Sequence, residues 1–252
     1  TLVIQAGNSY TYAGYCEDGK LVNILNEEGE PSFTSIVKFI GNGRMVGELL
    51  ALDKDSIDPK NTIRNIRRLV GKTYAETKTG KKINDPFTIV PSKLNKRPCI
   101  EVDYLGEKKK LFPEEILAMI LQRIRLLAER QTGEKIQDAV LTVPNCFSDA
   151  QRQAMKDAGI IAGFSNIRLC NEITAAAVSF AKSRESETND TFLFFDLGGG
   201  TCNAAVITID ENVFEVRSTS GNSQIGGNEF TEKIFNFVLS KFNFLQTSKE
   251  DL

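Results

Sequence analysis

The residues best suited to chemistry lie in the stretch FFDLGGGTCNAAV, residues 194–206. An apolar run ends at the carboxylate of Asp196, and a glycine-rich turn follows, made of Gly198, Gly199, Gly200 and Thr201. A turn of this kind exposes several backbone N–H groups in one direction, and such a concave array binds anions. Because glycine has no side chain, phosphate oxygens can approach the main chain closely. The stretch therefore predicts a phosphate site, with Asp196 as a ligand for magnesium, directly or through water.

Two well-known phosphate motifs do not fit this stretch. No Lys-Ser or Lys-Thr follows the glycines, so it is not a Walker A loop. The residues after the glycines read as a strand and not as a helix, which excludes the dinucleotide-binding fingerprint. A simpler alternative stays open at this point, namely that the glycines only satisfy the backbone geometry of a turn.

The same plan occurs twice in the chain. Residues 3–24 (VIQAGNSYTYAGYCEDGKLVNI) and 193–216 (LFFDLGGGTCNAAVITIDENVFEV) each read as strand, glycine turn, strand, polar turn and strand. In this alignment Gln5 corresponds to Asp196, and Gly7 to Gly198. We expect one structural unit used twice, with its two glycine turns facing each other across a cleft, where small ligands usually bind.

Other elements must hold these turns in place. We predict a helix from Pro113 to its cap at Gly133, and a strand at 139–143 that Pro144 ends. Ser148 and Gln151 form a capping box for the next helix. A strand at 166–170 leads to Glu172 and a helix over 173–183, and the polar residues 183–190 read as a linker between two lobes.

The remaining segments lie before and after these elements. Residues 62–70 look helical, with Ile63, Ile66 and Leu69 or Val70 on one face, and residues 72–110 read as short strands in a subdomain of their own. A final helix follows Gly226 and Gly227. We assign its Phe230 and Ile234 to the core, and expect its apolar face over 230–244 to be exposed if the second lobe is incomplete.

Composition excludes several classes of function. The 252 residues carry 31 basic and 33 acidic side chains, a net charge of −2, which argues against a nucleic-acid binder that relies on bulk charge. No apolar run is long enough to suggest a membrane span. The chain has no histidine, and its five cysteines show no CxxC spacing, which disfavours an ordinary zinc site and suits a reducing, cytoplasmic compartment.

At this point the residues resemble the nucleotide-binding domain of the seventy-kilodalton heat-shock chaperone family. The segments that carry the resemblance are PKNTIRNIRRLVG (59–71), AVLTVPNCFSDAQRQAMKDAGIIAG (139–163), NEITAAAVSFA (171–181), FDLGGGT (195–201) and IGGNEF (225–230). The resemblance implies an α/β, actin-like ATPase fold made of two duplicated ribonuclease H-like lobes. We expect the first lobe at 1–185, with a subdomain at about 35–111, and an incomplete second lobe starting at 186–252.

The resemblance also implies a site, in which ATP or ADP with Mg²⁺ binds between the lobes. Arg67, Glu172 and Asp196 match catalytic positions, and Asp196 also matches the position near the metal. The positions that match nucleotide-binding residues are Gly7, Asn8, Ser9, Tyr10, Gly198, Gly199, Gly200, Thr201, Gly226 and Gly227. The implied partners are client polypeptides, bound by a domain outside this chain, together with J-domain co-chaperones and nucleotide exchange factors, but neither nucleic acid nor a membrane.

Several positions depart from the family pattern. The family usually has aspartate at Gln5 and Asn203, lysine at Arg67, and proline at Ile173. Neutral amides are poorer magnesium ligands than carboxylates, and arginine is not a conservative replacement for lysine. We therefore expect nucleotide binding with weak hydrolysis. The alternative is a non-catalytic relative that acts as a nucleotide-binding scaffold or as an exchange factor.

Simpler interpretations of single residues remain. Arg67 beside Arg68 is also what a solvated helix face looks like, and Glu172 is also a favourable first residue of a helix. Gln5 can face a hydrated metal without harm, because magnesium keeps several of its waters. Cys202 reads as a small core residue and not as a nucleophile.

Overall fold

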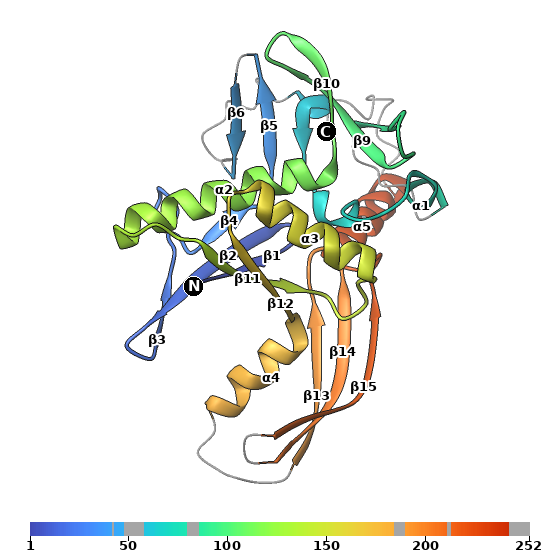
Figure 1. The fold of residues 1–252 in the computed structure, drawn as a ribbon. Helices are drawn as coiled ribbons and strands as arrows, with labels where there is room; N and C mark the ends of the chain where they lie inside the picture. The colour runs from blue at the N-terminus through green and yellow to red at the C-terminus, as the bar shows by residue number, and fades with distance from the viewer. Residues whose placement is uncertain (42, 48–57, 80–85, 184–189, 211–212, 242–252) are drawn as a thin grey trace.

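A computed structural model describes the chain except for residues 42, 48–57, 80–85, 184–189, 211–212 and 242–252. Its centre is a six-stranded sheet in which β12, β11, β1, β2 and β3 lie in this order, with β4 paired to β2 (Figure 1). The strands are β1 (Leu2–Ala6), β2 (Tyr10–Glu17), β3 (Lys20–Asn23), β4 (Ser32–Thr34), β11 (Asp138–Val143) and β12 (Asn166–Asn171). β1, β11 and β12 are parallel, whereas β1, β2 and β3 form an antiparallel meander.

A second sheet repeats the meander. It consists of β13 (Asp190–Leu197), β14 (Cys202–Asp210) and β15 (Val213–Asn222), which pair in chain order and antiparallel. In each meander a glycine turn joins the first two strands, Gly7 in one and Gly198 in the other. The predicted repeat of one structural unit is confirmed.

Three helices connect the two meanders. They are α2 (Pro113–Thr132), α3 (Asp149–Ile161) and α4 (Glu172–Lys182). α2 ends as predicted at Gly133, which has φ of 71°, and α3 begins with the predicted capping box of Ser148 and Gln151. α2 and α3 pack on each other and on the central sheet, while α4 packs against both sheets. The first residue of α4, Glu172, is thereby held between the two meanders.

Two small sheets flank the central one. The first contains β5 (Val37–Ile40), β6 (Gly43–Val46) and β7 (Thr62–Ile63), and the second contains β8 (Thr88–Pro91), β9 (Pro98–Tyr104) and β10 (Glu107–Leu111). The expected short strands of 72–110 are therefore present in the second sheet. The sequence pattern did not predict the short helix α1 (Tyr74–Thr79).

The prediction of a helix over 62–70 is wrong. The segment starts in β7 and continues into a single 3₁₀ turn, η3 (Ile66–Arg68), after the short 3₁₀ turn η2 (Pro59–Asn61). Asn65 separates β7 from η3 with a left-handed backbone, φ 56° and ψ 21°, which no α-helix continues. Ile63, Ile66 and Leu69 are nevertheless buried. Their spacing of three residues also matches the three residues per turn of a 3₁₀ helix, so it does not distinguish such a turn from an α-helix.

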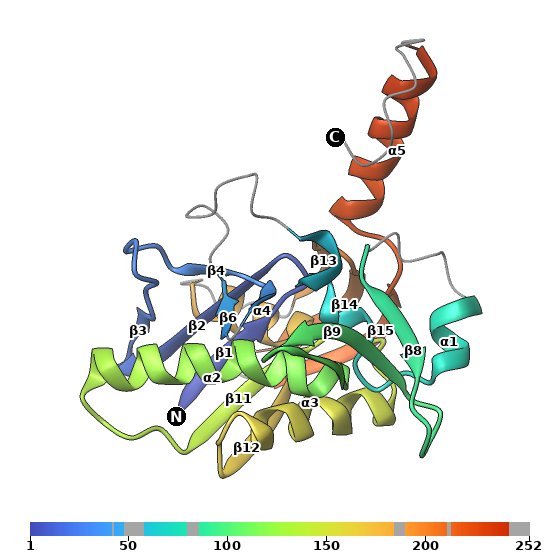
Figure 2. The same ribbon diagram turned by 90° about the horizontal axis from the view of Figure 1, so that it is seen from above.

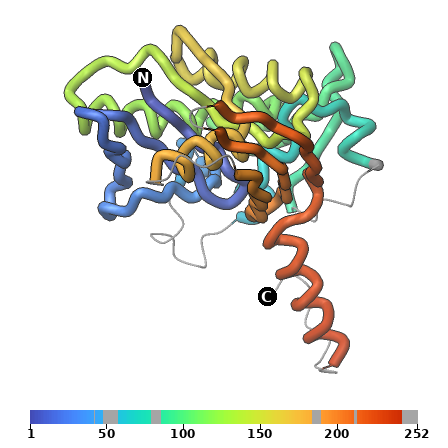
Figure 3. Tube along the Cα trace, turned by 90° about the horizontal axis from the view of Figure 1, so that it is seen from below, coloured from blue at the N-terminus to red at the C-terminus, as the bar shows by residue number. Residues whose placement is uncertain are grey.

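The prediction that Phe230 and Ile234 belong to the core is also wrong. They lie on α5 (Gly227–Lys241), where 49% and 64% of their surface is exposed, and no residue of this helix is buried. Figures 2 and 3 show why: α5 projects away from the rest of the described chain. The expected exposed apolar face is present over the described part of the helix, and Val238 belongs to it.

The buried apolar residues form two clusters. The larger joins the central sheet to α2, α3 and the flanking sheets. The smaller joins α4 to the second sheet through Ile173, Ala177 and Ile207. The predicted linker at 183–190 falls almost entirely on residues outside the described part of the chain. Among the described helices, none is both long and apolar enough to cross a membrane.

Candidate functional site

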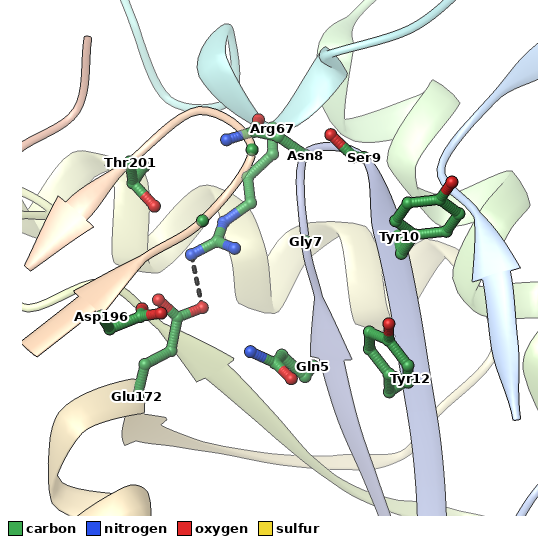
Figure 4. A pocket seen from close by; sticks show the side chains of 12 residues that line it. Gln5, Gly7, Asn8, Ser9, Tyr10, Tyr12, Arg67, Glu172, Asp196 and Thr201 are labelled. Atoms are coloured by element: carbon green, nitrogen blue, oxygen red, sulfur yellow. Dashed lines mark hydrogen bonds and ion pairs between the residues drawn. The ribbon is translucent and has the colours of Figure 1, made fainter. Parts of the chain in front are cut away.

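The two glycine turns meet at one pocket. Its cavity of about 210 Å³ lies between the β1–β2 turn and the β13–β14 turn, with the start of α4 beside them (Figure 4). It is lined by Gln5, Gly7, Asn8, Ser9, Tyr10, Tyr12, Arg67, Glu172, Asp196, Gly198, Gly199 and Thr201. Pockets that enclose a whole drug-sized ligand start at about 300 Å³. The cavity therefore suits the phosphate end of a nucleotide better than a complete one.

Glycine is required where the turns approach each other. A Cβ atom on Gly199 would lie 2.2 Å from Oγ of Ser9, in the opposite turn. A Cβ atom on Gly7 would lie 2.2 Å from the carbonyl oxygen of Tyr10, within its own turn. Both distances are shorter than any ordinary contact. A side chain on Gly7 would force the main chain of its own turn to move, whereas one on Gly199 would displace the Ser9 side chain of the opposite turn. Gly7 therefore serves the geometry of its turn, and Gly199 allows the two turns to approach each other.

Both turns present free backbone donors. Within the described residues, the N–H groups of Asn8, Ser9, Gly199, Gly200 and Thr201 form no hydrogen bond to the protein. Backbone donors are normally paired, and unpaired ones at the edge of a pocket await a ligand or water. Phosphate oxygens accept charge-assisted hydrogen bonds, which are about twice as strong as neutral ones. The turns therefore fit a polyphosphate.

An ion pair crosses the pocket. The guanidinium of Arg67, on η3, donates to the carboxylate of Glu172 at 2.6 Å, and the two side chains are only 4% and 6% exposed (Figure 4). The Arg67 guanidinium also lies 5.4 Å from the centre of the Phe147 ring. Arg67 is thus a buried residue of the pocket, and the interpretation of a solvated helix face is wrong.

Burial sets the electrostatics of this pair. Desolvation raises the pKa of the Glu172 carboxyl above its usual value, the nearby charge of Asp196 raises it further, and Arg67 opposes both. A carboxylate whose pKa is raised in this way is a stronger base than a solvated one, and Arg67 compensates a negative charge that burial disfavours. Glu172 is also the first residue of α4. It therefore both begins a helix and lines the pocket.

The donor set fits a hydrated magnesium ion better than a directly caged one. Among described residues, no group of three or more acidic or cysteine side chains could enclose a metal. Asp196 lines the pocket, and Asn203, opposite it in the sheet register, is fully buried with both amide atoms unpartnered. Magnesium is commonly bound by one or two carboxylates, phosphate oxygens and several waters. Asp196 would hold such an ion, with Gln5 facing its waters, whereas Asn203 does not line the pocket.

Comparison with known proteins identifies the family. The family model described as "Hsp70 protein" matches residues 2–251. The chain belongs to the Hsp70 family. Its two duplicated α/β units are the actin-like ATPase fold of Hsp70 nucleotide-binding domains, as the resemblance implied.

Individual Hsp70 relatives agree with this assignment. "Heat shock 70 kDa protein 2" of Paracoccidioides lutzii is 37% identical over 99% of this chain, and "Heat shock 70 kDa protein" of Emericella nidulans is 36% identical over 99%. "Putative heat shock 70 kDa protein 7" of Homo sapiens is 36% identical over 95% of the chain, which covers 65% of that protein. The chain spans 38% of the length of each of the first two relatives.

Three of the glycines assigned by the Hsp70 resemblance lie behind the pocket and do not line it. A Cβ atom on Gly226 would lie 2.4 Å from the backbone nitrogen of Gly200, and the Gly227 N–H donates to the carbonyl of Gly198 at 2.9 Å. The start of α5 is therefore packed directly on the second glycine turn. In this structure Gly200, Gly226 and Gly227 support the shape of the turn.

Two residues of the site were missed by sequence reasoning. Tyr12 lines the pocket beside Tyr10, and it pairs with Gln5 across β1 and β2. The signal was available, since residues two apart on a strand share a face. The other is Arg68, which donates to the Gly200 carbonyl at 3.1 Å and to Glu229 of α5 at 2.5 Å. No local pattern predicts a partner that lies 161 residues away.

Proposed function

We propose that this chain is the ATP- or ADP-binding region of a heat-shock-type chaperone, with weak hydrolysis. In the complete protein, nucleotide state would control the binding and folding of client polypeptides in the cytoplasm. J-domain co-chaperones and exchange factors would act on the same cycle. Residues 1–185 would form the first lobe, with a subdomain at about 35–111, and residues 186–252 would begin the second.

The two facing glycine turns support the binding step. The phosphates would be held by the backbone N–H groups of Asn8, Ser9, Gly199 and Thr201. These residues line the pocket, and their N–H groups have no partner among the described residues. Asp196 would hold the magnesium ion through its carboxylate or through water. The bound ion would supply charge neutralisation of the phosphates.

The buried Arg67–Glu172 pair carries the proposal of weak hydrolysis. Glu172 would position the attacking water, but its carboxylate is already engaged by a guanidinium at 2.6 Å. Gln5 lines the pocket with a neutral amide where the resemblance expects a carboxylate, and Asn203 is a second neutral amide, buried beside Asp196. Loss of one positioned catalytic group commonly costs about 100-fold in rate, although such losses are not additive.

A second proposed function rests on the same features, the buried Arg67–Glu172 pair and the neutral amides. A site that holds nucleotide without turning it over would serve as a structural scaffold, or as an exchange factor for an active chaperone of the family. Two neutral amides favour this alternative, because the resemblance expects carboxylates at both positions. They belong to Gln5, which lines the pocket, and to Asn203, which is buried beside Asp196 in the sheet register.

Calorimetry and single-turnover kinetics on the full-length protein test both proposals, the weakly hydrolysing chaperone and the non-catalytic relative. ATP and ADP binding would be measured with Mg²⁺ and with a chelator, and hydrolysis would be followed at saturating enzyme. The unmodified protein would be compared with the triple variant Gln5→Asp, Arg67→Lys and Asn203→Asp. Arg217→Lys, at an exposed position of β15, is the matched control.

Tight binding with slow turnover, accelerated at least ~10-fold in the triple variant, supports the proposal. Equal turnover in the unmodified and triple variants removes the claim of weak hydrolysis. Absence of binding by either nucleotide refutes the whole assignment. Faster ADP release from an active Hsp70 chaperone on addition of this protein would favour the exchange-factor alternative.

A further inference from the structure

The start of α5 holds two carbonyl groups of the second glycine turn. The N–H of Gly227 donates to the carbonyl of Gly198, and the N–H of Asn228 donates to the carbonyl of Gly199, both at 2.9 Å. Neither Gly227 nor Asn228 lines the phosphate pocket. These two carbonyl groups are therefore turned away from the pocket and toward α5.

The third carbonyl of the turn is held by a side chain. Arg68, on η3, donates through Nη2 both to the carbonyl of Gly200 at 3.1 Å and to the carboxylate of Glu229 at 2.5 Å. Glu229 lies in the first turn of α5, so one guanidinium nitrogen joins the glycine turn to the helix. Arg68 does not line the phosphate pocket either, so this carbonyl also points away from it.

Arg68 is itself held in place. A Cβ atom on Gly200 would lie 2.7 Å from Nε of Arg68, so this side chain packs directly against the turn. Close by along the chain, Asn65 precedes η3 as its N-cap, and its Oδ1 accepts from the side chain of Asn228 at 2.8 Å. η3 and the start of α5 are thus joined at two points, one at each end of the 3₁₀ turn.

These contacts determine where the N–H groups of the turn point. Every described peptide bond is trans, and in a planar trans unit the C=O and the N–H point in opposite directions. The N–H of Gly199 is therefore directed away from α5, and the N–H of Thr201 away from Arg68. Both residues line the phosphate pocket, and neither N–H has a partner among the described residues.

A glycine turn needs such external contacts to keep one orientation. Glycine adopts backbone angles that are closed to other residues, so the peptide units between Gly198 and Thr201 can rotate at little steric cost. The bonds to Gly227 and Asn228 come from the backbone of α5 and do not depend on a side chain. Only the Gly200 carbonyl depends on a side chain, that of Arg68.

We propose that Arg68 is a positioning residue for phosphate, which holds the Gly200 carbonyl so that the N–H of Thr201 faces the bound nucleotide. Arg68 acts through the backbone and does not touch the phosphates itself. This role rests on the nucleotide-binding function proposed above and identifies the side chain that orients one of its donors.

Removing Arg68 alone also removes a positive charge near the phosphates, so charge and position have to be separated. The double variant Arg68→Met, Glu229→Gln removes both charges of the pair and leaves the net charge of the site unchanged. The matched control is Arg125→Met, Glu129→Gln, which removes a partly buried ion pair on α2 that does not line the pocket.

Calorimetry on the full-length protein would compare ADP with adenosine. We expect the Arg68 double variant to bind ADP at least ~10-fold more weakly, as when one hydrogen bond to a charged group is lost, and to bind adenosine as the unmodified protein does. The control variant should bind both ligands normally. Equal ADP affinity in the two double variants would overturn the proposal. An equal loss for ADP and adenosine would also overturn it, because a general disturbance of the fold weakens both.

Crystal structures of the nucleotide-free variants give a readout that does not depend on the nucleotide assignment. In the Arg68 double variant we expect the Gly200–Thr201 peptide unit to rotate, so that its carbonyl no longer points toward η3 and α5. The control should keep the original orientation. An unrotated peptide unit in the Arg68 double variant overturns the proposal. Failure of the unmodified protein to bind ADP would instead refute the nucleotide assignment, and the crystal structures would still decide the role of Arg68.

Discussion

The Arg67–Glu172 pair allows a sharp prediction about stability. Both side chains are more than nine-tenths buried and their charged atoms lie 2.6 Å apart. Removing one member of a buried pair leaves an uncompensated charge, at a cost of about 3–5 kcal/mol. We therefore expect Arg67→Met to lower the free energy of unfolding by about 3 kcal/mol near pH 8. Arg217→Met breaks the exposed pair with Glu215 and should cost at most about 1 kcal/mol.

The pH dependence of this loss follows from the pKa of Glu172. That pKa is raised in the folded protein, mainly by desolvation, so the folded state keeps its proton in a range where the unfolded state has released it. The contribution of Glu172 to stability therefore falls as the pH rises through this window. Removing Arg67 eliminates the one influence that lowers the pKa. The cost of Arg67→Met should thus be largest at pH 8 and shrink as the pH approaches 4.5, the ordinary pKa of a glutamate carboxyl.

Urea denaturation at pH 8 and pH 5 measures these quantities. A double-mutant cycle with Glu172→Gln isolates the interaction, and we expect the double variant to recover most of the loss, because no buried charge remains. The reasoning is refuted if the two single losses add within about 0.5 kcal/mol, which is the limit for independent sites. It is also refuted if the cost of Arg67→Met is the same at both pH values.

Three further predictions concern the turns, α5 and a thiol. Gly199→Ala brings a Cβ atom to 2.2 Å from Oγ of Ser9 in the opposite turn and should weaken ADP binding by at least ~10-fold, measured by calorimetry. The control Gly43→Ala, whose Cβ atom meets only one atom at 3.9 Å, should leave ADP binding unchanged. Arg68→Met should raise the hydrogen-exchange rate of the first turn of α5, because it removes the 2.5 Å ion pair to Glu229, and unchanged protection there would refute this anchoring role. The pKa of Cys146 is raised mainly by desolvation above 9.0, the ordinary pKa of a thiol. Its alkylation should therefore be slow at pH 7.4 and accelerate up to and beyond pH 9, and a rate that levels off below pH 8 would contradict this.

Local patterns in the sequence were sufficient for much of the fold. The glycine turns, the Pro113 and Gly133 boundaries of α2 and the capping box of α3 each depend on a few neighbouring residues, and each was predicted correctly. The repeat of the strand–turn–strand unit was also visible, because it preserves the alternation of apolar residues and the place of the glycines. These features follow from backbone sterics and hydrogen bonding within one element.

Other features depended on contacts between distant segments. The burial of Ile63 and Ile66 was predictable from spacing, but the left-handed Asn65 between them replaced a helix by a strand and a 3₁₀ turn. The apolar face of α5 has helical spacing, yet whether Phe230 is buried depends on what packs against it. Periodicity identifies an apolar face and does not identify its neighbour.

The charged groups of the site also divide into what local sequence shows and what contacts between distant segments establish. The sequence shows that arginines 67 and 68, Glu172 and Glu229 are present, and the resemblance indicated that Arg67 and Glu172 belong near phosphate. Their pairing depends on the folded chain, since Arg67 meets a carboxylate 105 residues away and Arg68 one 161 residues away. Those pairings fix how strongly each charge is desolvated and compensated. A charge has that environment only after the chain has folded around it.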